Sequence, residues 1–507
     1  MDTRRPFYVT TSIAYVNAPP HIGFALELVY ADATARFRRM LGDDVFFLTG
    51  TDEHGTKVAR KAEENGVTPK QFADEMSVLY RTLAKNLNTT ISDFYRTTDV
   101  RHVKPVEEFW KRAVANGYIY KKAYKGLYCI GCEAFKTEKE LVEGKCPDHH
   151  TVPEYFEEEN YFFALSAFRE RLLAMYGDRP DFVVPEAKFN EIKQLVDEGL
   201  EDISVSRSKL QLEWGITVPD DPTQVIYVWF DALINYVSAI GFGSDEKNFD
   251  RFWPSATHII GKEINRFHTA LWPAMLMAAD VPVPHQVCVH GWIHVDGQKM
   301  SKTLGNVINP NDLLAKYGTD ATRYLLLSQI PFSSDGDWNK ERSDQKYLSD
   351  LANDLGNLVY RVTSMLHKYR GGIVPAATKG ERPLAWEELA QHMSMLRFDL
   401  ALESIWKTVR DANQYVDQTK PWTLAKEGKD AELDATLYHL METVRQVAWM
   451  VRPFMPEASD KMLDQLSQGA ERENFSIDDV SAWGSLTQGT KVSVGEPLFP
   501  RLEDGVK

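Results

Sequence analysis

The chain has 507 residues, of which 43% are hydrophobic and 26% are charged, and its formal net charge is −15. Length and composition predict a globular protein of roughly three domains, taking ~150 residues for each. The acidic charge excludes a protein that simply coats nucleic acid, but it leaves open RNA binding through a local basic face. We expect no signal peptide and no membrane span, and four cysteines in so long a chain favour a reducing cytoplasm.

Strand and helix patterns alternate at the start of the chain. Phe7–Ser12 and Val45–Thr49 are rich in aromatic and β-branched residues and are predicted to be buried strands. Apolar residues at helical spacing predict a helix that begins near His21, and further helices over residues 68–87 and 103–116. This alternation is typical of a parallel α/β sheet.

The α/β pattern stops near Gly117 and returns at residues 225–236, 258–260 and 286–292. The segment between carries a cysteine cluster and short aromatic runs. We therefore expect an insertion between two halves of one α/β domain.

The second half of the chain has a different pattern. Asp296-Gly297 predicts a tight turn. From about Asp350 to Arg452 the apolar spacing is helical throughout, which predicts a helical domain.

The first candidate site is Pro20-His21-Ile22-Gly23, where a loop meets the predicted start of a helix. Free backbone N–H groups and the helix dipole favour phosphate at such a position, and an imidazole there can donate to phosphate oxygens. A histidine that only caps the helix or packs against it is the alternative, which this short pattern does not exclude.

The second candidate site is Lys299-Met300-Ser301-Lys302-Thr303, just after the predicted turn. Two lysines on a short loop suit a triphosphate, because negative charge builds on pyrophosphate as it departs. A solvated basic turn is the alternative. Taken together and in this order, the two motifs indicate the two halves of an ATP site that transfers AMP to a carboxylate.

The cysteines form the third candidate site. Cys129-x2-Cys132 and Cys146-x2-His149 have the spacing of a tetrahedral zinc site with three thiolates and one imidazole. Such a site leaves no coordination position open, so its role would be structural. His150 could replace His149, and the residues do not distinguish zinc from another soft metal.

These motifs, with the stretches around them, resemble the methionyl-tRNA synthetases, a family of class I aminoacyl-tRNA synthetases. The resemblance runs from Tyr8 to about Pro456. It implies an α/β fold with a split Rossmann-like parallel-sheet catalytic domain and a zinc-bearing insertion, followed by an α-helical bundle that binds the anticodon. The implied divisions are the first catalytic half (1–116), the connective insertion with its zinc knuckle (117–224), the second catalytic half (225–295), a signature-loop and stem-contact region (296–349), the helical anticodon-binding domain (350–466) and a C-terminal tail (467–507).

The resemblance also implies the reaction of a methionine–tRNA ligase. Such an enzyme activates L-methionine with ATP, which Mg²⁺ accompanies, to methionyl-adenylate and pyrophosphate. It then transfers methionine to the 3'-terminal adenosine of tRNA(Met). The implied catalytic residues are His21, Lys299 and Lys302, and the implied ATP contacts are His21, Gly23, Gly261, Lys262, Glu263 and Lys302.

Methionine is a flexible apolar side chain with a weakly accepting sulfur, so a selective pocket needs aromatic walls and one or two polar tips. Among the residues that the resemblance assigns to this pocket, Asp52 would hold the substrate ammonium and Arg207 would lie near the substrate carboxylate. The full set is Ile13, Tyr15, Asp52, Arg207, Trp229, Ala232, Tyr236, Ile264, His268 and Trp272. Seen alone, each aromatic residue is more simply a core residue.

The resemblance assigns the anticodon to Asn357, Arg361 and Trp422. Asn357 and Arg361 share one helical face and could hydrogen-bond base edges, while Trp422 offers a surface on which a base could stack. An ordinary surface of a helical bundle is the alternative.

One position departs from the family pattern. The first motif usually ends in a second histidine, but this chain has Phe24, which cannot donate to phosphate. A synthetase for another apolar amino acid, a related nucleotidyl-transferase and a non-catalytic tRNA-binding paralogue are the rival hypotheses. The chain has no long basic or dimerising extension, so we expect a monomer.

Overall fold

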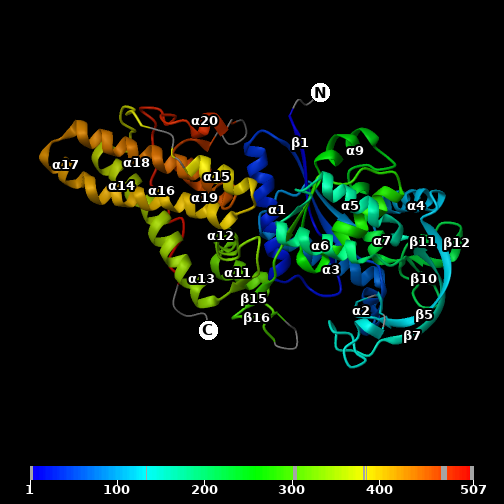
Figure 1. Ribbon diagram of the computed structural model, residues 1–507. Helices are drawn as coiled ribbons and strands as arrows, with labels where there is room; N and C mark the ends of the chain where they lie inside the picture. The colour runs from blue at the N-terminus through cyan, green and yellow to red at the C-terminus, as the bar shows by residue number, and fades with distance from the viewer. Residues whose placement is uncertain are drawn as a thin grey trace.

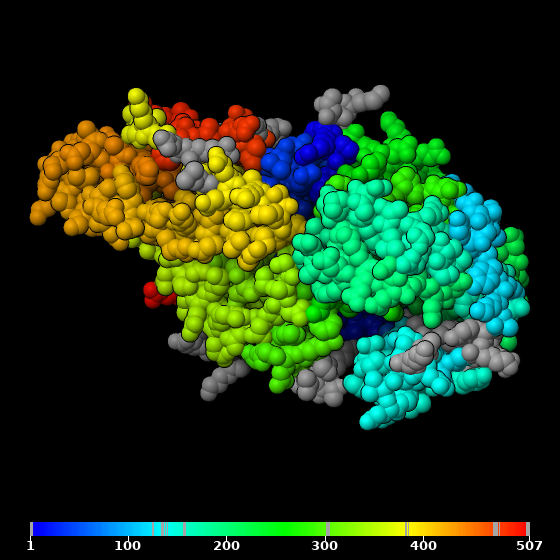
Figure 2. Space-filling model, in the orientation of Figure 1, coloured from blue at the N-terminus to red at the C-terminus, as the bar shows by residue number. Residues whose placement is uncertain are grey.

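The computed structural model describes residues 4–132, 134–136, 138–300, 305–380, 383, 385–469, 475 and 477–502. It has an α/β part built on a parallel sheet and an all-helical part that begins near residue 340 (Figure 1). The space-filling view shows the two parts in contact, with the segment after residue 120 projecting from the α/β part as a lobe (Figure 2). The fold class predicted from the sequence is confirmed.

A seven-stranded parallel sheet forms the centre of the α/β part. Its order is β2 (Ala14–Tyr15), β3 (Asp44–Asp52), β1 (Pro6–Thr11), β13 (Thr257–Gly261), β14 (Gln286–His290) and β8 (Val183–Val184), with β4 (Asp93–Arg96) also paired to β3. β2, β3 and β4 lie on one side of β1, whereas β13, β14 and β8 lie on the other. The carboxyl ends of β1 and β13 therefore form a topological switch point, where open α/β sheets bind their ligands.

Successive residues of the central strands belong to two different hydrophobic cores. Phe7 and Val9 lie in one core, whereas Tyr8 lies in the other. Ile259 and Ile260 alternate in the same way. Both faces of the sheet are thus covered, which explains the continuous apolar runs in the sequence.

Helices cover each face of the sheet. The first core contains residues of α1 (Ile22–Met40), α2 (Thr56–Glu64), α3 (Pro69–Asn86), α11 (Pro310–Tyr317) and α12 (Thr319–Gln329). The second contains residues of α4 (Val100–Ala115), η2 (Leu165–Phe168), α5 (Arg169–Asp178), α6 (Glu186–Glu198), α7 (Val228–Leu233), α8 (Asn235–Ser238), α9 (Glu246–Phe252), η3 (Trp253–Ser255), η5 (Phe267–Leu271) and α10 (Trp272–Ala278). The predicted strands and helices of the first 116 residues are all present, with ends within a few residues of those expected.

The insertion is mainly an antiparallel sheet. Its order is β6 (Ala134–Lys136), β5 (Ile119–Cys129), β7 (Glu154–Phe163) and β9 (Ile203–Ser204), and a second small sheet contains β10 (Ser206–Ser208), β12 (Asp221–Ile226) and β11 (Thr217–Val218). A short 3-10 helix, η1 (Glu138–Glu140), follows β6. The sequence analysis did not predict β8, which lies within residues 117–224 yet pairs with β14 in the parallel sheet.

The predicted tight turn joins two short antiparallel strands, β15 (Ile293–Val295) and β16 (Gln298–Lys299), and β17 (Gly336–Trp338) pairs with β15 in parallel. Asp296 and Gly297 both have positive φ, 51° and 75°. Two residues in this conformation make the turn that matches the twist of a hairpin, so the prediction is confirmed.

The helical part contains α13 (Lys340–Lys346), η6 (Tyr347–Gly356), α14 (Asn357–Arg370), α15 (Ala385–Ser394), α16 (Phe398–Thr419), α17 (Pro421–Glu427), α18 (Asp430–Val451), α19 (Pro456–Gln465) and α20 (Ile477–Ser481). The C-terminal segment returns to the start of this part, where the Tyr347 hydroxyl donates to the carbonyl of Pro500. Within the described ranges, every helix falls short of the length or the apolar character that a membrane crossing needs.

A buried arginine connects the two parts. Arg323 of α12 is fully buried and pairs with Asp32 of α1, at 2.7 Å. It also donates to the carbonyl of Leu87 in the α/β part and to the carbonyls of Pro453 and Phe454 in the helical part. One side chain thus satisfies buried acceptors on both sides of the junction.

We predict that Arg323→Ala lowers the free energy of unfolding by ~3–5 kcal/mol, because it removes one of the two arginines that pair with the buried Asp32 carboxylate and leaves three carbonyls without their donor. Urea denaturation followed by circular dichroism measures this change. Lys61→Ala, which breaks the exposed pair between Lys61 and Glu64, is the control and should change the free energy by less than ~1 kcal/mol. Equal stabilities of the two variants would contradict a structural role for Arg323.

Candidate active site

A cavity of about 620 Å³ lies at the carboxyl ends of β1 and β3, next to α7 and η5. It brings together residues that are more than 250 positions apart in the sequence, such as Ile13 and Lys299. The predicted site residues that line it are Ile13, Tyr15, Asp52, Trp229, Ala232, Tyr236, Glu263, Ile264, His268 and Lys299. The cavity occupies the topological switch point of the sheet, where a ligand is expected.

The apolar wall of the cavity consists of stacked aromatic rings. Trp229 and Phe267 lie face to face, with ring centroids 3.9 Å apart and nearly parallel planes. Trp272 is fully buried behind Tyr236, at 6.2 Å between centroids, and does not line the cavity. Phe267 is thus a wall residue that the sequence analysis did not name, and Trp272 lies one layer behind the cavity lining.

Two polar side chains lie at the buried end of this wall. The Tyr236 hydroxyl is 2.8 Å from Nε2 of His268, and Nδ1 of His268 is 3.1 Å from the carbonyl oxygen of Ile264. A carbonyl can only accept, so Nδ1 carries the proton and Nε2 accepts from the tyrosine. Burial lowers the pKa of His268 to about 4, so the ring is neutral at pH 7.

A buried carboxylate holds the walls in place. Asp231 of α7 accepts from Nδ1 of His54 at 2.6 Å and from Nε2 of His102 at 2.8 Å. Burial alone would raise the carboxyl pKa, but the two histidines overcome it and hold the pKa of Asp231 at about 2. His54 follows Asp52 in the chain, so this carboxylate ties the segment of Asp52 to the helix that carries Trp229.

α1 begins next to His21, as the sequence analysis predicts, and His21 is its N-cap, which is the alternative role considered for this residue. Its ring accepts a hydrogen bond from the backbone N–H of Gly23 at 3.1 Å, and the residue is exposed. A Cβ at Gly23 would lie 2.8 Å from the His21 ring, which explains the glycine. His21 does not line the 620 Å³ cavity.

Phe24 is a core residue. It is buried and meets Tyr80 of α3 edge to face, with ring centroids 5.0 Å apart. The side chain that departs from the family pattern therefore packs α1 against α3.

The remaining ATP-site candidates are distributed around the cavity mouth. Gly261 ends β13, and Lys262 extends to the carboxylate of Asp335, at 2.7 Å. Glu263 and Lys299 line the cavity, and so does Trp292, which the sequence analysis missed. Lys302 lies outside the described residues.

Arg207 is separated from the other predicted methionine contacts. It lines a second cavity, of about 590 Å³, and donates to the Ser204 hydroxyl at 2.9 Å and to the carbonyl of Ser206 at 2.7 Å. Its guanidinium lies over the ring of Tyr227, 4.7 Å from the centroid. Phe267 lines both cavities and forms part of the wall between them.

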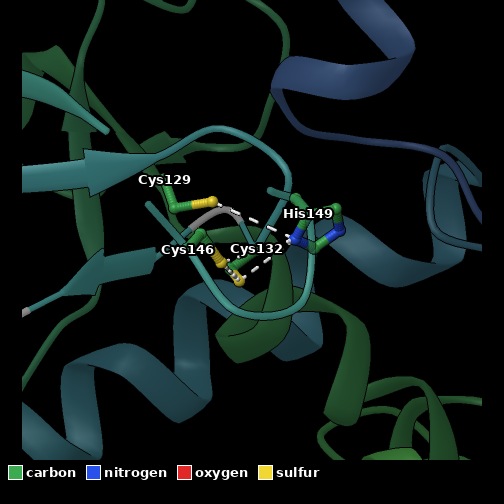
Figure 3. A group of neighbouring side chains, drawn as sticks. All are labelled: Cys129, Cys132, Cys146 and His149. Carbon is green, nitrogen blue, oxygen red and sulfur yellow. Dashed lines mark hydrogen bonds between the residues drawn. The ribbon is translucent and has the colours of Figure 1, made fainter. Parts of the chain in front are cut away.

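The three cysteines and His149 converge as a candidate metal centre (Figure 3). Their ligand atoms all lie within 4.8 Å of one another, and Nδ1 of His149 is 3.4 Å from Sγ of Cys132. Three thiols and one imidazole at this spacing suit a tetrahedral divalent metal. His150 is not part of the cluster, which resolves the alternative ligand in favour of His149.

The metal centre borders the candidate active site. Cys132 and His149 line the 620 Å³ cavity as well as the cluster. A Cβ at Gly131 would lie 2.3 Å from the His149 ring, so only glycine leaves room for this histidine.

The predicted anticodon residues lie on the helical part. Asn357 and Arg361 belong to α14, and Arg361 pairs with Asp417 of α16 at 2.9 Å. Trp422 is 45% exposed on α17, which follows α16 directly. An exposed tryptophan is suited to stacking with an unpaired base.

Two family models match nearly the whole chain. The model for class I tRNA synthetases (M) matches residues 7–152 and 148–363, and the model for the anticodon binding domain of methionyl tRNA ligase matches residues 379–507. The chain belongs to the methionyl-tRNA synthetase family.

Curated relatives and solved structures agree with this assignment. The methionine–tRNA ligase of Thermotoga maritima is 44% identical over 98% of this chain and 80% of its own length, and that of Clostridium acetobutylicum is 46% identical over 99% and 79%. Mycobacterium tuberculosis methionyl-tRNA synthetase in complex with methionyl-adenylate superposes with a TM-score of 0.93, at 40% identity over 98% of this chain and all of that chain. The apo form of that enzyme superposes with a TM-score of 0.87, at 37% identity over 99% of both chains. The protein is therefore a methionine–tRNA ligase, which activates methionine and charges tRNA.

The buried His268 makes folding sensitive to acid. As pH falls below 6.5, the unfolded chain binds a proton at this residue, whereas the folded protein binds it only near pH 4. We predict that the wild-type protein loses ~2 kcal/mol more stability than His268→Gln between pH 7 and pH 5. Urea denaturation at both pH values measures the difference. Equal losses in the two proteins would contradict a neutral His268 in the folded state.

Proposed function

We propose that the 620 Å³ cavity binds methionine and one end of ATP, and that methionyl-adenylate forms there. The observation that carries this proposal is the stacked aromatic wall, which ends in an uncharged pair of polar groups, Tyr236 and His268. A neutral hydroxyl and imidazole suit a thioether sulfur better than a charged group would, because sulfur is only a weak acceptor.

The polar part of the amino acid faces the sheet. Asp52 lines the cavity beyond the aromatic wall and supplies the counter-ion for the substrate ammonium. Ile13, Tyr15, Trp229, Ala232 and Ile264 surround the side chain. Trp272 and Arg207 do not contact the substrate directly. Trp272 packs against Tyr236, and Arg207 packs over Tyr227, so each supports a tyrosine.

ATP binds between the N-terminus of α1 and the β13 end of the sheet. Gly261, Lys262 and Glu263 contact ATP from the end of β13, while His21 and Gly23 face the phosphates at the start of α1, where the helix dipole favours negative charge. The methionine carboxylate attacks the α-phosphorus, the bond to the β-phosphate oxygen breaks, and pyrophosphate leaves with Mg²⁺. His21, Lys299 and Lys302 stabilise the charge on the α-phosphate and on the departing pyrophosphate.

The second step joins methionine to tRNA. A hydroxyl of the 3'-terminal adenosine of tRNA(Met) attacks the adenylate carbonyl, and AMP leaves. Asn357, Arg361 and Trp422 read the anticodon on the helical part. We further propose that the enzyme works as a cytoplasmic monomer.

Zinc is the metal that we propose for the cysteine cluster. Cys129, Cys132, Cys146 and His149 would hold it and leave no open coordination position, so it would stabilise the insertion and take no part in the reaction.

We predict that His21→Ala and Lys302→Ala each slow methionine-dependent exchange between ATP and pyrophosphate by ~100-fold or more, since each removes a donor to developing charge. Binding of methionine alone, measured by equilibrium dialysis, should change less than twofold. Lys70→Ala, an exposed substitution on α3, is the control for both assays. Near-normal exchange in both active-site variants would contradict these roles.

We predict that His149→Ala loses its zinc, whereas His150→Ala keeps one zinc ion per chain, because only His149 belongs to the cluster. Inductively coupled plasma mass spectrometry of the purified variants measures the metal. Loss of metal should also raise the Michaelis constant for methionine, since Cys132 and His149 line the cavity. Equal zinc contents in the two variants would refute the ligand assignment.

A further inference from the structure

Trp292 contacts two lysines at the mouth of the active-site cavity. Its ring centroid is 3.8 Å from the Nζ atom of Lys262 and 3.9 Å from the Nζ atom of Lys299. The two lysines come from distant parts of the chain, the end of β13 and the strand β16. Both ammonium groups are within the range of a strong cation–π contact with one indole ring.

Carboxylates fix the ring and one of the lysines. Nε1 of Trp292 donates to the Glu263 carboxylate at 3.0 Å, and its backbone N–H donates to Asp335 at 2.9 Å. Asp335 also accepts from Lys262, with both of its oxygens at 2.7 Å from Nζ. The ring therefore has a defined orientation before any ligand arrives.

The charges around the ring have a physical consequence. Donation of the indole N–H to a carboxylate polarises the ring and increases the negative potential of its faces, which strengthens the attraction to ammonium groups. Yet two ammonium groups held by one ring repel each other. A polyanion that contacts both ammonium groups offsets this repulsion, whereas a neutral ligand does not.

The position of the ring favours a phosphate ligand. Trp292, Glu263 and Lys299 line the same cavity as Tyr15 and Asp52. Trp292 is only half-buried, so core packing does not account for its contacts. We propose that Trp292 is a positioning residue, which holds Lys262 and Lys299 as a paired cation site for the polyphosphate chain of ATP.

This inference rests on the proposed function for its ligand, but it concerns a residue that the proposed function does not use. The ring does not touch the reacting atoms. It acts through the two lysines, by keeping their charges where the phosphates arrive and so reducing the entropy that must be lost on binding.

Two substitutions isolate the contribution of the ring. Trp292→Phe and Trp292→Met both lose the N–H that donates to Glu263, and both keep an apolar side chain. Only phenylalanine keeps an aromatic face for the lysines. We expect the Michaelis constant for ATP, measured by pyrophosphate exchange, to be roughly 5- to 30-fold higher in Trp292→Met than in Trp292→Phe. The Michaelis constant for methionine should differ less than twofold between them.

Trp483 provides the matched control. It is also half-buried, and its Nε1 donates one hydrogen bond, to the carbonyl of Thr378 at 3.1 Å, but it lies far from the cavity at the C-terminal end of the chain. Trp483→Phe and Trp483→Met should have equal Michaelis constants for ATP. Thermal unfolding of all four variants reveals any general loss of structure.

A binding measurement separates the inference from the enzymatic assay. Titration of the wild-type protein with pyrophosphate alone should change its tryptophan fluorescence, and this change should be absent in Trp292→Phe and smaller in Lys299→Ala. Equal Michaelis constants for ATP in Trp292→Phe and Trp292→Met, or a parallel rise in that for methionine, would overturn the proposal. If the wild-type protein exchanged no pyrophosphate at all, the proposed function would fail, while the fluorescence titration would still test the cation pair.

Discussion

The candidate active site depends on one buried carboxylate. Asp231 of α7 accepts hydrogen bonds from His54, in the segment after β3, and from His102 of α4. A buried charge is costly unless it is fully paired, so these segments can only pack in the arrangement that satisfies it. That arrangement brings Asp52, Trp229 and Ala232 into the lining of one cavity. The buried Asp231 and its two histidines thereby fix the distance between the charged and apolar parts of the substrate site.

The chemistry of the cavity follows from the separation of its charged and neutral side chains. The aromatic end contains a neutral tyrosine–histidine pair, while carboxylates and lysines gather at the sheet edge and at the hairpin that carries Lys299. An apolar side chain and a polyphosphate can therefore occupy one cavity without competing for the same groups. The metal cluster forms part of its rim, so the fold of the insertion and the shape of the cavity are linked.

Local features could be predicted from the sequence, because neighbouring residues determine them. The start of α1 next to His21 and the turn at Asp296-Gly297 are examples. Most of the residues that the family resemblance assigns to methionine line one cavity in the structure. What the resemblance could not supply were the contacts that depend on the packing of distant segments. β8 is only two residues long and has no periodic pattern. Phe24 packs against Tyr80, which lies 56 residues further along the chain. Arg207 donates hydrogen bonds to Ser204 and Ser206 in its own segment. Trp292 belongs to no motif, and only the fold brings Lys262 and Lys299 to its ring.

The most direct test of the account is a crystal structure with a non-hydrolysable analogue of methionyl-adenylate. The account predicts the thioether sulfur against Tyr236 and His268, the ammonium on Asp52, the adenosine beside Gly261 and Glu263, and the phosphate facing the N-terminus of α1. An analogue bound instead in the second cavity, beside Arg207, or a methionine side chain directed away from the aromatic wall, would contradict it.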